Sequence, residues 1–317
     1  MIDMEVRIVF MGTPDFAVPS LKILVENGYQ VVGVVTASDK YGGRGGKQLI
    51  ESAVKKYALS QQIPILQPTN LKSTSFQNAL AALNANLQIV VAFRMLPAAV
   101  FEMPTLGTFN LHGSLLPKYR GAAPINWAVM NGEPTTGVTT FFLKPQIDTG
   151  DILFQEEMPI GEEETVGEVH DHMMELGAKV VLKTVQAIEK QDYTLIPQDE
   201  TLACPAPKIF HETCQIDFSK PIEQVHNFVR GLSPYPAAWT TLEGKILKIL
   251  RSKKITTPHN YSFGRVLSDN KTYIQIAVKD GLLEVEELQL QGRKRMTTKD
   301  FLNGYKFQLN TQLLYEG

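Results

Sequence analysis

The side chains best suited to chemistry in this 317-residue sequence are an asparagine and a histidine two positions apart, Asn110 and His112. They alternate with the apolar residues Phe109 and Leu111, and Gly113 follows directly. In a strand, residues two apart point to the same face, so both polar side chains are expected together where the strand ends. An amide donor beside an imidazole can stabilise a developing oxyanion and handle a proton near neutral pH. The alternative is that His112 is a structural histidine.

A carboxylate is also needed, to set the charge of the imidazole and to accept a proton. Asp148 lies in the loop Gln146-Ile147-Asp148-Thr149-Gly150-Asp151, between two apolar runs. An aspartate in such a turn most often bonds the neighbouring backbone, and Asp151 is a rival candidate by position. The spacing in the sequence does not choose between the two.

The elements that must position these residues follow from the apolar periodicity. Strands are predicted at residues 6–11, 31–36, 87–92, 107–111, 137–143 and 152–159, and helices at about 14–28, 47–60 and 166–190. Short apolar strands separated by helices predict an α/β fold, with a Rossmann-like, mostly parallel sheet covered by helices on both faces. Ligands of such folds bind beyond the carboxyl ends of the strands, where Asn110 and His112 are expected.

The loop after the first strand, Gly12-Thr13-Pro14-Asp15, occupies the position of a dinucleotide-binding glycine motif. It has a single glycine, and Pro14 lacks the amide that could bind phosphate, so an NAD-type site is not expected. We predict instead that Thr13 is a helix N-cap with Pro14 at the first helical position.

The composition changes at Cys204-Pro205-Ala206-Pro207, which predicts a catalytic domain at 1–206 and a second domain at 207–317. The second part contains one helical pattern, Ile222–Gly231. Five short strands, at 238–242, 245–251, 264–267, 273–277 and 282–290, predict a small OB-like β-barrel, a common nucleic-acid-binding architecture. Tyr235 and Trp239 are expected in its core.

The net charge of −2 hides an uneven distribution. Residues 1–206 carry 15 Lys and Arg against 22 Asp and Glu, whereas residues 207–317 carry 16 against 11. An excess of five positive charges in the second part suggests a polyanionic partner, although ordinary surface variation explains it equally well.

Several classes of protein are not expected. No run of about 20 apolar residues could span a membrane, and residues 1–7 do not resemble a signal or transit peptide. The two cysteines, Cys204 and Cys214, are too few for a metal cluster or a disulfide framework. A cytoplasmic protein is therefore predicted.

Asn110-x-His112, the segment Ser114-Leu115-Leu116-Pro117 and, downstream, Asp148 together resemble the formyl-folate transferase and hydrolase group. Residues 11–17, 119–124 and 147–150 resemble the members that formylate methionyl-tRNA, over nearly the whole chain. The resemblance implies that Asn110, His112 and Asp148 are catalytic and that 10-formyltetrahydrofolate donates the formyl group. The proposed chemistry needs no metal, and the expected partner of this predicted monomer is the initiator methionyl-tRNA. An aminosugar-nucleotide formyltransferase and a formyl-folate hydrolase are the alternatives within the group.

The same resemblance implies a folate site. It comprises residues of two segments: Ser114, Leu115, Leu116, Pro117, Phe93, Arg94, Met95 and Leu96. Many members have Tyr-Gly where this chain has Phe93-Arg94, which leaves the role of Arg94 open. For Phe93, Met95 and Leu96, packing in the core is an equal alternative.

The resemblance also assigns tRNA contacts to basic residues in two regions. The first is the glycine-rich loop 38–47, whose family counterpart contacts the acceptor stem, with Lys40, Arg44 and Lys47. The second is the barrel, with Lys245, Lys248, Arg251, Arg293 and Lys294, beside Lys253, Lys254 and Arg295. Strand alternation predicts that Lys245 and Arg251 share a face and that Lys248 lies on the other. Solvated surface charge is the alternative for each of these residues.

Overall fold

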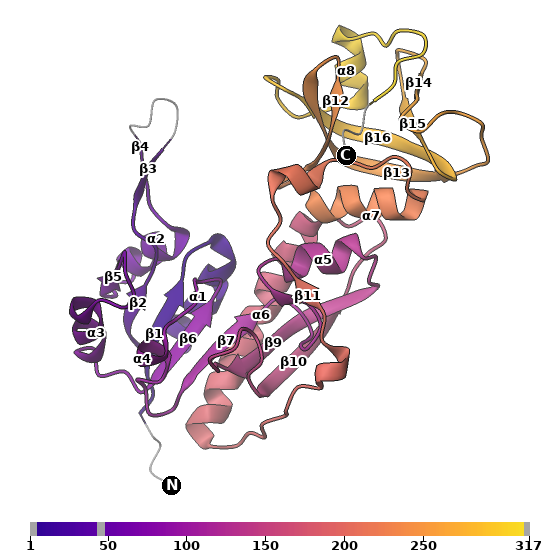
Figure 1. The fold of residues 1–317 in the computed structure, drawn as a ribbon. Helices are drawn as coiled ribbons and strands as arrows, with labels where there is room; N and C mark the ends of the chain where they lie inside the picture. The colour runs from indigo at the N-terminus through magenta and orange to yellow at the C-terminus, as the bar shows by residue number, and fades with distance from the viewer. Residues whose placement is uncertain (1–4, 43–47, 314–317) are drawn as a thin grey trace. The chain divides into compact units, whose positions relative to one another are not determined.

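The computed structural model describes residues 5–42 and 48–313 (Figure 1). By internal contacts the chain forms two compact units. The first comprises residues 1–121, 137–158 and 170–205, and the second comprises residues 122–136, 159–169 and 206–317. Among the described residues, no helix is both long and apolar enough to span a membrane. The division into domains at 1–206 and 207–317 stays a prediction.

A seven-stranded sheet forms the centre of the first unit, in the order β10-β9-β7-β6-β1-β2-β5. Its strands are β1 (Arg7–Gly12), β2 (Gln30–Val35), β5 (Ile65–Leu66), β6 (Leu87–Val91), β7 (Thr108–His112), β9 (Thr135–Phe142) and β10 (Ile152–Pro159). The pairs from β5 to β7 are parallel, and β9 runs antiparallel to β7. The predicted mostly parallel sheet is confirmed.

Helices and short elements connect these strands. They are η1 (Asp15–Ala17), α1 (Val18–Glu26), α2 (Ala53–Ser60), α3 (Thr74–Ala81), α4 (Ala98–Phe101), α6 (Val166–Lys190) and η2 (Glu200–Leu202), with the β3–β4 hairpin (Lys40–Gly42, Gln48–Ile50) and the pair β8–β11 (Arg120–Gly121, Pro205–Ala206). One core joins the sheet residues Val9 and Val90 to Phe76 of α3 and Val100 of α4. On β7, Leu111 packs close to Gly177 of α6. Because side chains alternate along a strand, Asn110 and His112 point to the face opposite Leu111.

An antiparallel sheet with the path β12-β13-β16-β15-β14 forms most of the second unit, and β17 pairs with β16. Its strands are β12 (Ala238–Leu242), β13 (Lys245–Thr256), β14 (Val266–Ser268), β15 (Ile274–Val278), β16 (Gly281–Leu290) and β17 (Met296–Thr297). The helical elements of this unit are α5 (Pro124–Met130), η3 (His211–Cys214), α7 (Ile222–Leu232) and α8 (Thr298–Gly304). Val225 and Val229 of α7 and Phe301 of α8 pack with the strand residues Ile249 and Leu288 in one core. The predicted small β-domain after the parallel sheet is confirmed.

Three local predictions are wrong. Thr13 does not cap a helix, because a 3-10 turn with Pro14 at its N-cap comes first and Pro19 lies in the first turn of α1. The helix predicted from residue 47 begins only at Ala53, where the Ser52 hydroxyl accepts from the Lys55 N–H. Tyr235 is 81% exposed rather than part of a core. Trp239, by contrast, packs against the core of the second unit, as expected.

Candidate functional site

Asn110 and His112 lie at the carboxyl end of β7, next to the end of β6. The parallel register pairs Asn110 with Val90, so the loops after the two strands leave the sheet side by side. Asn110 is half-buried, and its side-chain amide has no hydrogen-bond partner among the residues that the structure describes. The amide is therefore free to donate to a ligand.

His112 is 5% exposed, and its two ring nitrogens have different surroundings. Nε2 lies 2.8 Å from the backbone carbonyl oxygen of Tyr119. A carbonyl only accepts hydrogen bonds, so Nε2 carries a hydrogen and donates it. Nδ1 is therefore the nitrogen left for proton chemistry, and it faces Asp148.

Asp148 approaches His112 from the loop between β9 and β10. Its Oδ2 atom is 3.8 Å from His112 Nδ1 and accepts a hydrogen bond of 2.9 Å from the Gly121 N–H. At 3.8 Å the contact with the imidazole is too long for a direct hydrogen bond but suits an ion pair or a bridging water. The backbone of Asp148 is in the left-handed region (φ 54°), which a non-glycine residue adopts only when its surroundings hold it there.

The structure separates the two carboxylate candidates in space. Asp151 forms an ion pair of 2.9 Å with Lys144 and has no contact with His112 among the described residues. Asp148, in contrast, is within 4 Å of the imidazole. An amide, an imidazole and a carboxylate are thus brought to one place, and their catalytic roles stay a prediction.

The segment Ser114–Pro117 forms a mostly buried turn after Gly113, close to the end of β7. The Thr139 hydroxyl donates to the Ser114 carbonyl at 2.6 Å and accepts from the Leu116 N–H at 3.0 Å. The Ser114 hydroxyl donates to the Lys118 carbonyl at 2.6 Å, and Gln155 donates to the Leu116 carbonyl at 2.8 Å. These bonds attach the turn to β9 and β10, and its contact with folate stays a prediction.

The second predicted folate segment follows β6 and has mixed surroundings. Leu96 is buried in the core, and Phe93 packs partly against the same core. Met95 is 69% exposed. Arg94 donates to the carbonyls of Thr69 and Pro68, and its guanidinium lies 5.7 Å from the centre of the Phe93 ring. The side chain of Arg94 therefore braces the loop before α3.

Of the basic residues predicted in the glycine-rich loop, only Lys40 is described. It lies on β3 of the hairpin and is exposed. Arg44 and Lys47 lie outside the described residues. The base of the hairpin is held by Lys55, which pairs with Asp39 and, at 2.8 Å, with Glu51. This ion pair and hydrogen bond from Lys55 hold the pKa of Asp39 below its ordinary value.

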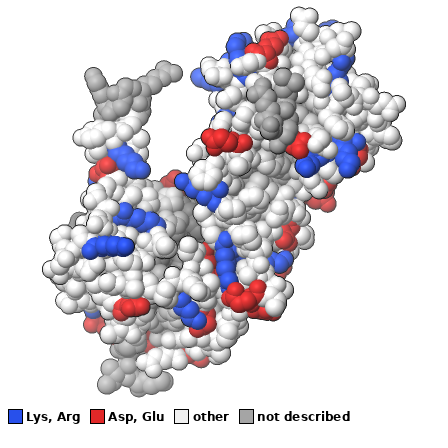
Figure 2. Space-filling view, in the orientation of Figure 1, with Lys and Arg blue, Asp and Glu red and all other residues white. Residues whose placement is uncertain are grey.

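The basic residues that the sequence singled out in the second unit have three kinds of surroundings. Arg251, Lys253, Lys254 and Arg295 are paired with Glu168, Glu286, Glu223 and Glu287. Lys245, Arg293 and Lys294 are exposed and have no ion pair within the described part of the chain. Lys248 is half-buried and donates to the Pro236 carbonyl at 3.3 Å. On the face in Figure 2, basic and acidic side chains are intermixed rather than gathered in one basic patch.

The predicted alternation along β13 is wrong. The pairing of β13 with β16 shifts register between Ile249 and Arg251 and again between Arg251 and Ser252. Leu247, Ile249 and Ser252 are all buried, so the period of two is broken before Arg251. A β-bulge of this kind reverses the faces beyond it, and Lys245 and Arg251 therefore do not share a face.

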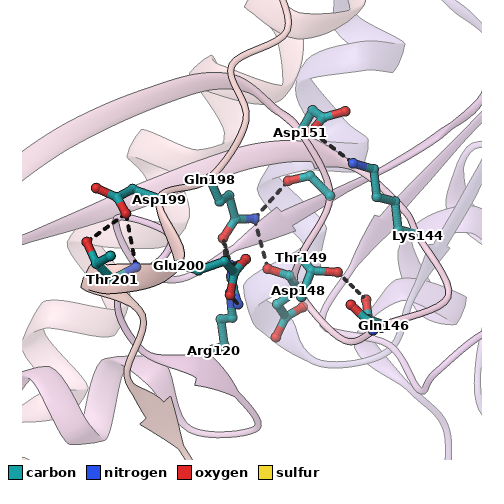
Figure 3. Close-up of polar contacts among 11 residues, drawn as sticks. Arg120, Lys144, Gln146, Asp148, Thr149, Asp151, Gln198, Asp199, Glu200 and Thr201 are labelled. Atoms are coloured by element: carbon teal, nitrogen blue, oxygen red, sulfur yellow. Dashed lines mark hydrogen bonds and ion pairs between the residues drawn. The ribbon is translucent and has the colours of Figure 1, made fainter.

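Polar residues around the Asp148 loop were not predicted from the sequence. Gln198 donates to the carbonyls of Asp148 and Gly150 and accepts from Arg120, which also binds Glu200 through two hydrogen bonds (Figure 3). The carboxylate of Glu200 raises the pKa of the Arg120 guanidinium, and that of Asp148 adds to the effect. A glutamine fifty positions from the loop it contacts has no signature in a single sequence. Among the described residues, no three His, Cys, Asp or Glu side chains are grouped to hold a metal ion.

Comparison with known proteins places this site in a family. A model described as formyl transferase matches residues 6–185, and one described as formyl transferase, C-terminal domain, matches residues 208–306. The methionyl-tRNA formyltransferase of Parabacteroides distasonis is 55% identical over 312 residues, which cover 95% of this chain and 96% of the relative. The chain belongs to the methionyl-tRNA formyltransferase family. The enzyme of the same name from Flavobacterium johnsoniae is 51% identical over 308 residues, 96% of this chain and 97% of the relative.

Solved structures share the fold at lower identity. One, described as a sugar 3N-formyl transferase in the presence of dTDP and 5-N-formyl-THF, has a TM-score of 0.67 and 20% identity, and the match covers 92% of this chain and all of that chain. The N-formyltransferase of Helicobacter canadensis, in complex with folinic acid and dTDP-3-aminofucose, has a TM-score of 0.68 and 21% identity. That match covers 88% of this chain and 98% of the other. These similarities show a common fold.

Proposed function

We propose that the chain transfers the formyl group of 10-formyltetrahydrofolate to the free amino group of the initiator methionyl-tRNA, giving formylmethionyl-tRNA for translation initiation. The observation that carries this proposal is the 55% identity to a methionyl-tRNA formyltransferase over nearly the full length of both chains. The meeting of Asn110, His112 and Asp148 supports it independently. We further propose that the enzyme acts as a cytoplasmic monomer.

In this proposal Asn110 and His112 stabilise the negative charge that develops on the formyl oxygen. When a neutral amine attacks a formyl carbon, a carbon–nitrogen bond forms and negative charge develops on that oxygen. The Asn110 amide, which has no partner within the described part of the chain, can donate to this charge, and a protonated imidazole beside it adds positive charge. Removing one donor of this kind typically costs about 3–4 kcal/mol of transition-state stabilisation.

Asp148 handles the proton. The attacking amine must lose a proton, and the folate nitrogen must gain one as its bond to the formyl carbon breaks. With His112 Nε2 committed to the Tyr119 carbonyl, the proton passes between Nδ1 and the Asp148 carboxylate, 3.8 Å away, through one bridging water.

The formyl-folate is proposed to bind where the loops after β6 and β7 lie side by side. Ser114–Pro117, Phe93, Arg94, Met95 and Leu96 are its proposed contacts, mainly through their backbone, because most of their side chains are buried or bonded. The exposed Met95 is the exception.

The tRNA is proposed to contact the exposed basic residues. Lys245, Arg293 and Lys294, which lack acidic partners within the described residues, and Lys40 on the hairpin are the leading candidates. Lys248 and Arg251 are weaker candidates, because Lys248 already donates to the Pro236 carbonyl and Arg251 already forms an ion pair with Glu168. Arg44 and Lys47 are proposed on the family resemblance alone.

An acceptor panel tests the assignment. Purified protein and 10-formyltetrahydrofolate are supplied with initiator methionyl-tRNA, another aminoacylated tRNA, an aminosugar nucleotide, or no acceptor. Formylation of methionyl-tRNA that weakens as salt rises is expected. Formylation of the sugar amine without methionyl-tRNA, or hydrolysis of the donor alone, would replace the proposed acceptor.

A second experiment separates catalysis from binding. His112→Ala is expected to abolish turnover while the affinity for tRNA stays within about twofold, because the phosphate contacts that dominate such affinity lie elsewhere. Wild-type rates in this variant would remove His112 from the mechanism.

A further inference from the structure

Three features of the first unit converge on the pair His112 and Asp148 without belonging to the predicted trio. Gln198 contacts the Asp148 loop, Arg120 contacts Gln198, and Cys204 contacts the backbone on which His112 depends. We propose that Gln198 and Cys204, two residues of the stretch 196–204 (the bracing segment), hold the His112–Asp148 pair in its working geometry, with Gln198 as the principal positioning residue. This inference rests on the proposed catalytic role of Asp148.

Gln198 acts as a clamp on the Asp148 turn, and its burial sets it apart from its neighbours in the sequence. Within residues 191–200 it is half-buried, whereas the remaining nine residues are all exposed. Its Nε2 group donates to the Asp148 carbonyl at 2.9 Å and to the Gly150 carbonyl at 2.8 Å. One side-chain amide thus uses both of its N–H groups on the same turn, as the dashed lines from the Gln198 nitrogen in Figure 3 show.

The turn needs such a clamp because its backbone is unfavourable. Asp148 has a φ of 54°. A left-handed conformation at a non-glycine residue persists only where surrounding contacts fix it. A β-carbon on Gly150 would collide with the Phe142 carbonyl, so the turn also approaches β9 very closely.

Arg120 fixes the other end of the clamp. Its Nε and Nη2 groups donate to Gln198 Oε1 at 3.0 Å and 2.7 Å. With its oxygen held by two guanidinium donors, the Gln198 amide can present only its NH₂ group to the Asp148 turn. Glu200 in turn accepts two bonds of 2.8 Å from Arg120, which fixes the guanidinium plane.

The same segment braces the histidine. The Cys204 carbonyl accepts from the Arg120 N–H at 2.9 Å, and Cys204 Sγ accepts from the Tyr119 N–H at 3.2 Å. Tyr119, whose φ is 60°, supplies the carbonyl that accepts from His112 Nε2. One end of the bracing segment therefore fixes the carboxylate and the other fixes the imidazole.

Two variants of Gln198 test the roles of its donor NH₂ group and its acceptor oxygen. Gln198→Glu keeps the shape and still accepts from Arg120, but it loses both donors and faces two carbonyls with a carboxylate. Gln198→Ala removes both halves. Because a misplacement of about 1 Å at a reacting group can cost about 100-fold in rate, we expect kcat to fall about 10- to 100-fold in each. The KM values for methionyl-tRNA and for 10-formyltetrahydrofolate should change less than about threefold, since Gln198 touches neither proposed binding segment.

The matched control is the neighbouring residue. The Asp199 carboxylate bonds the Thr201 N–H at 2.9 Å and the Thr201 hydroxyl at 2.7 Å, away from Asp148. Asp199→Ala removes only these two local bonds and leaves the bonds of Gln198 and Cys204 in place, so kcat should stay near the wild-type value. A loss in Asp199→Ala equal to that in Gln198→Ala, or a wild-type kcat in Gln198→Glu, would overturn the proposal.

A double-mutant cycle ties the effect to Asp148. If Gln198 acts only through the carboxylate, Gln198→Ala should cost little more when Asp148→Asn is already present. Full additivity would mean that Gln198 acts by another route, and the proposal would be wrong. A wild-type rate in Asp148→Asn alone would instead refute the proposed role of Asp148. An inactive Asp148→Asn beside a fully active Gln198→Ala would refute only the bracing role.

Discussion

The Thr139 hydroxyl makes three hydrogen bonds around the turn Ser114–Pro117. Replacing this hydroxyl by a methyl group tests whether these bonds hold the turn in place. Thr139 is fully buried. Its hydroxyl donates to the Ser114 carbonyl at 2.6 Å and accepts from the Leu116 N–H and from Gln155, both at 3.0 Å. Thr139→Val keeps the shape and removes all three bonds.

The expected cost follows from the backbone groups left behind. The Leu116 N–H and the Ser114 carbonyl each lose this buried partner, at about 1–3 kcal/mol each. Gln155 keeps its bond to the Leu116 carbonyl, so it adds little. The extra methyl of valine offsets part of the loss, which leaves a destabilisation of about 2–4 kcal/mol. Thr139→Ser keeps the hydroxyl and loses one methyl, which costs only about 1 kcal/mol.

Urea unfolding of the two variants, followed by tryptophan fluorescence and circular dichroism, measures the difference. Thr139→Val should also raise the KM for 10-formyltetrahydrofolate more than Thr139→Ser does, because the turn Ser114–Pro117 is released. If Thr139→Val were as stable as Thr139→Ser, burial of apolar surface, and not the hydrogen bonds, would be what holds this turn.

Three further outcomes are expected. Arg230→Met should lower the free energy of unfolding by about 2–4 kcal/mol in urea titrations, because its guanidinium is buried and bonds two backbone carbonyls; a change below about 0.5 kcal/mol would contradict this. Burial holds the pKa of His226 below its ordinary value, against the pull of Glu163 and with Lys254 and Arg230 adding to it. The unfolded state therefore binds the proton first, stability should fall as pH drops below about 6.5, and His226→Gln should flatten that decline in melting curves from pH 7 to 5. Gly150→Ala should lower kcat, since the new methyl meets a backbone carbonyl, and an unchanged kcat would show that the loop adapts.

Features that depend on local periodicity could be predicted from the sequence. The helix expected at 166–190 is α6, Val166–Lys190, and the strand expected at 238–242 is β12. The placement of Asn110 and His112 on one face of β7 also follows from alternation alone. Proximity of Asp148 to His112 is not a local property, and the structure was needed to choose it over Asp151.

The failures are those in which a distant contact overrides a local pattern. The alternation predicted along β13 is wrong because the register between β13 and β16 shifts around Arg251. The residue types of β13 do not predict that shift. Residues 48–50 look helical in isolation, yet they form β4 because β3 pairs with them. Tyr235 lies between Pro234 and Pro236, and its exposure depends on chain geometry that an aromatic residue type does not encode.

Asn110 and His112 could be placed together from the sequence, whereas the bracing segment could not be predicted. Asn110 and His112 need only a strand, which the sequence encodes over five residues. A carboxylate on a loop without regular structure needs contacts from elsewhere to stay within reach of the imidazole. Here the Gly121 N–H bonds the carboxylate, and Gln198, fifty positions away, bonds the backbone of the loop. Any glutamine in an exposed stretch looks like solvated surface until the partner loop is placed beside it. Precision at a reacting group is therefore carried by residues whose types are ordinary, which is why substitution of Gln198 is expected to slow turnover more than substitution of its charged neighbour Asp199.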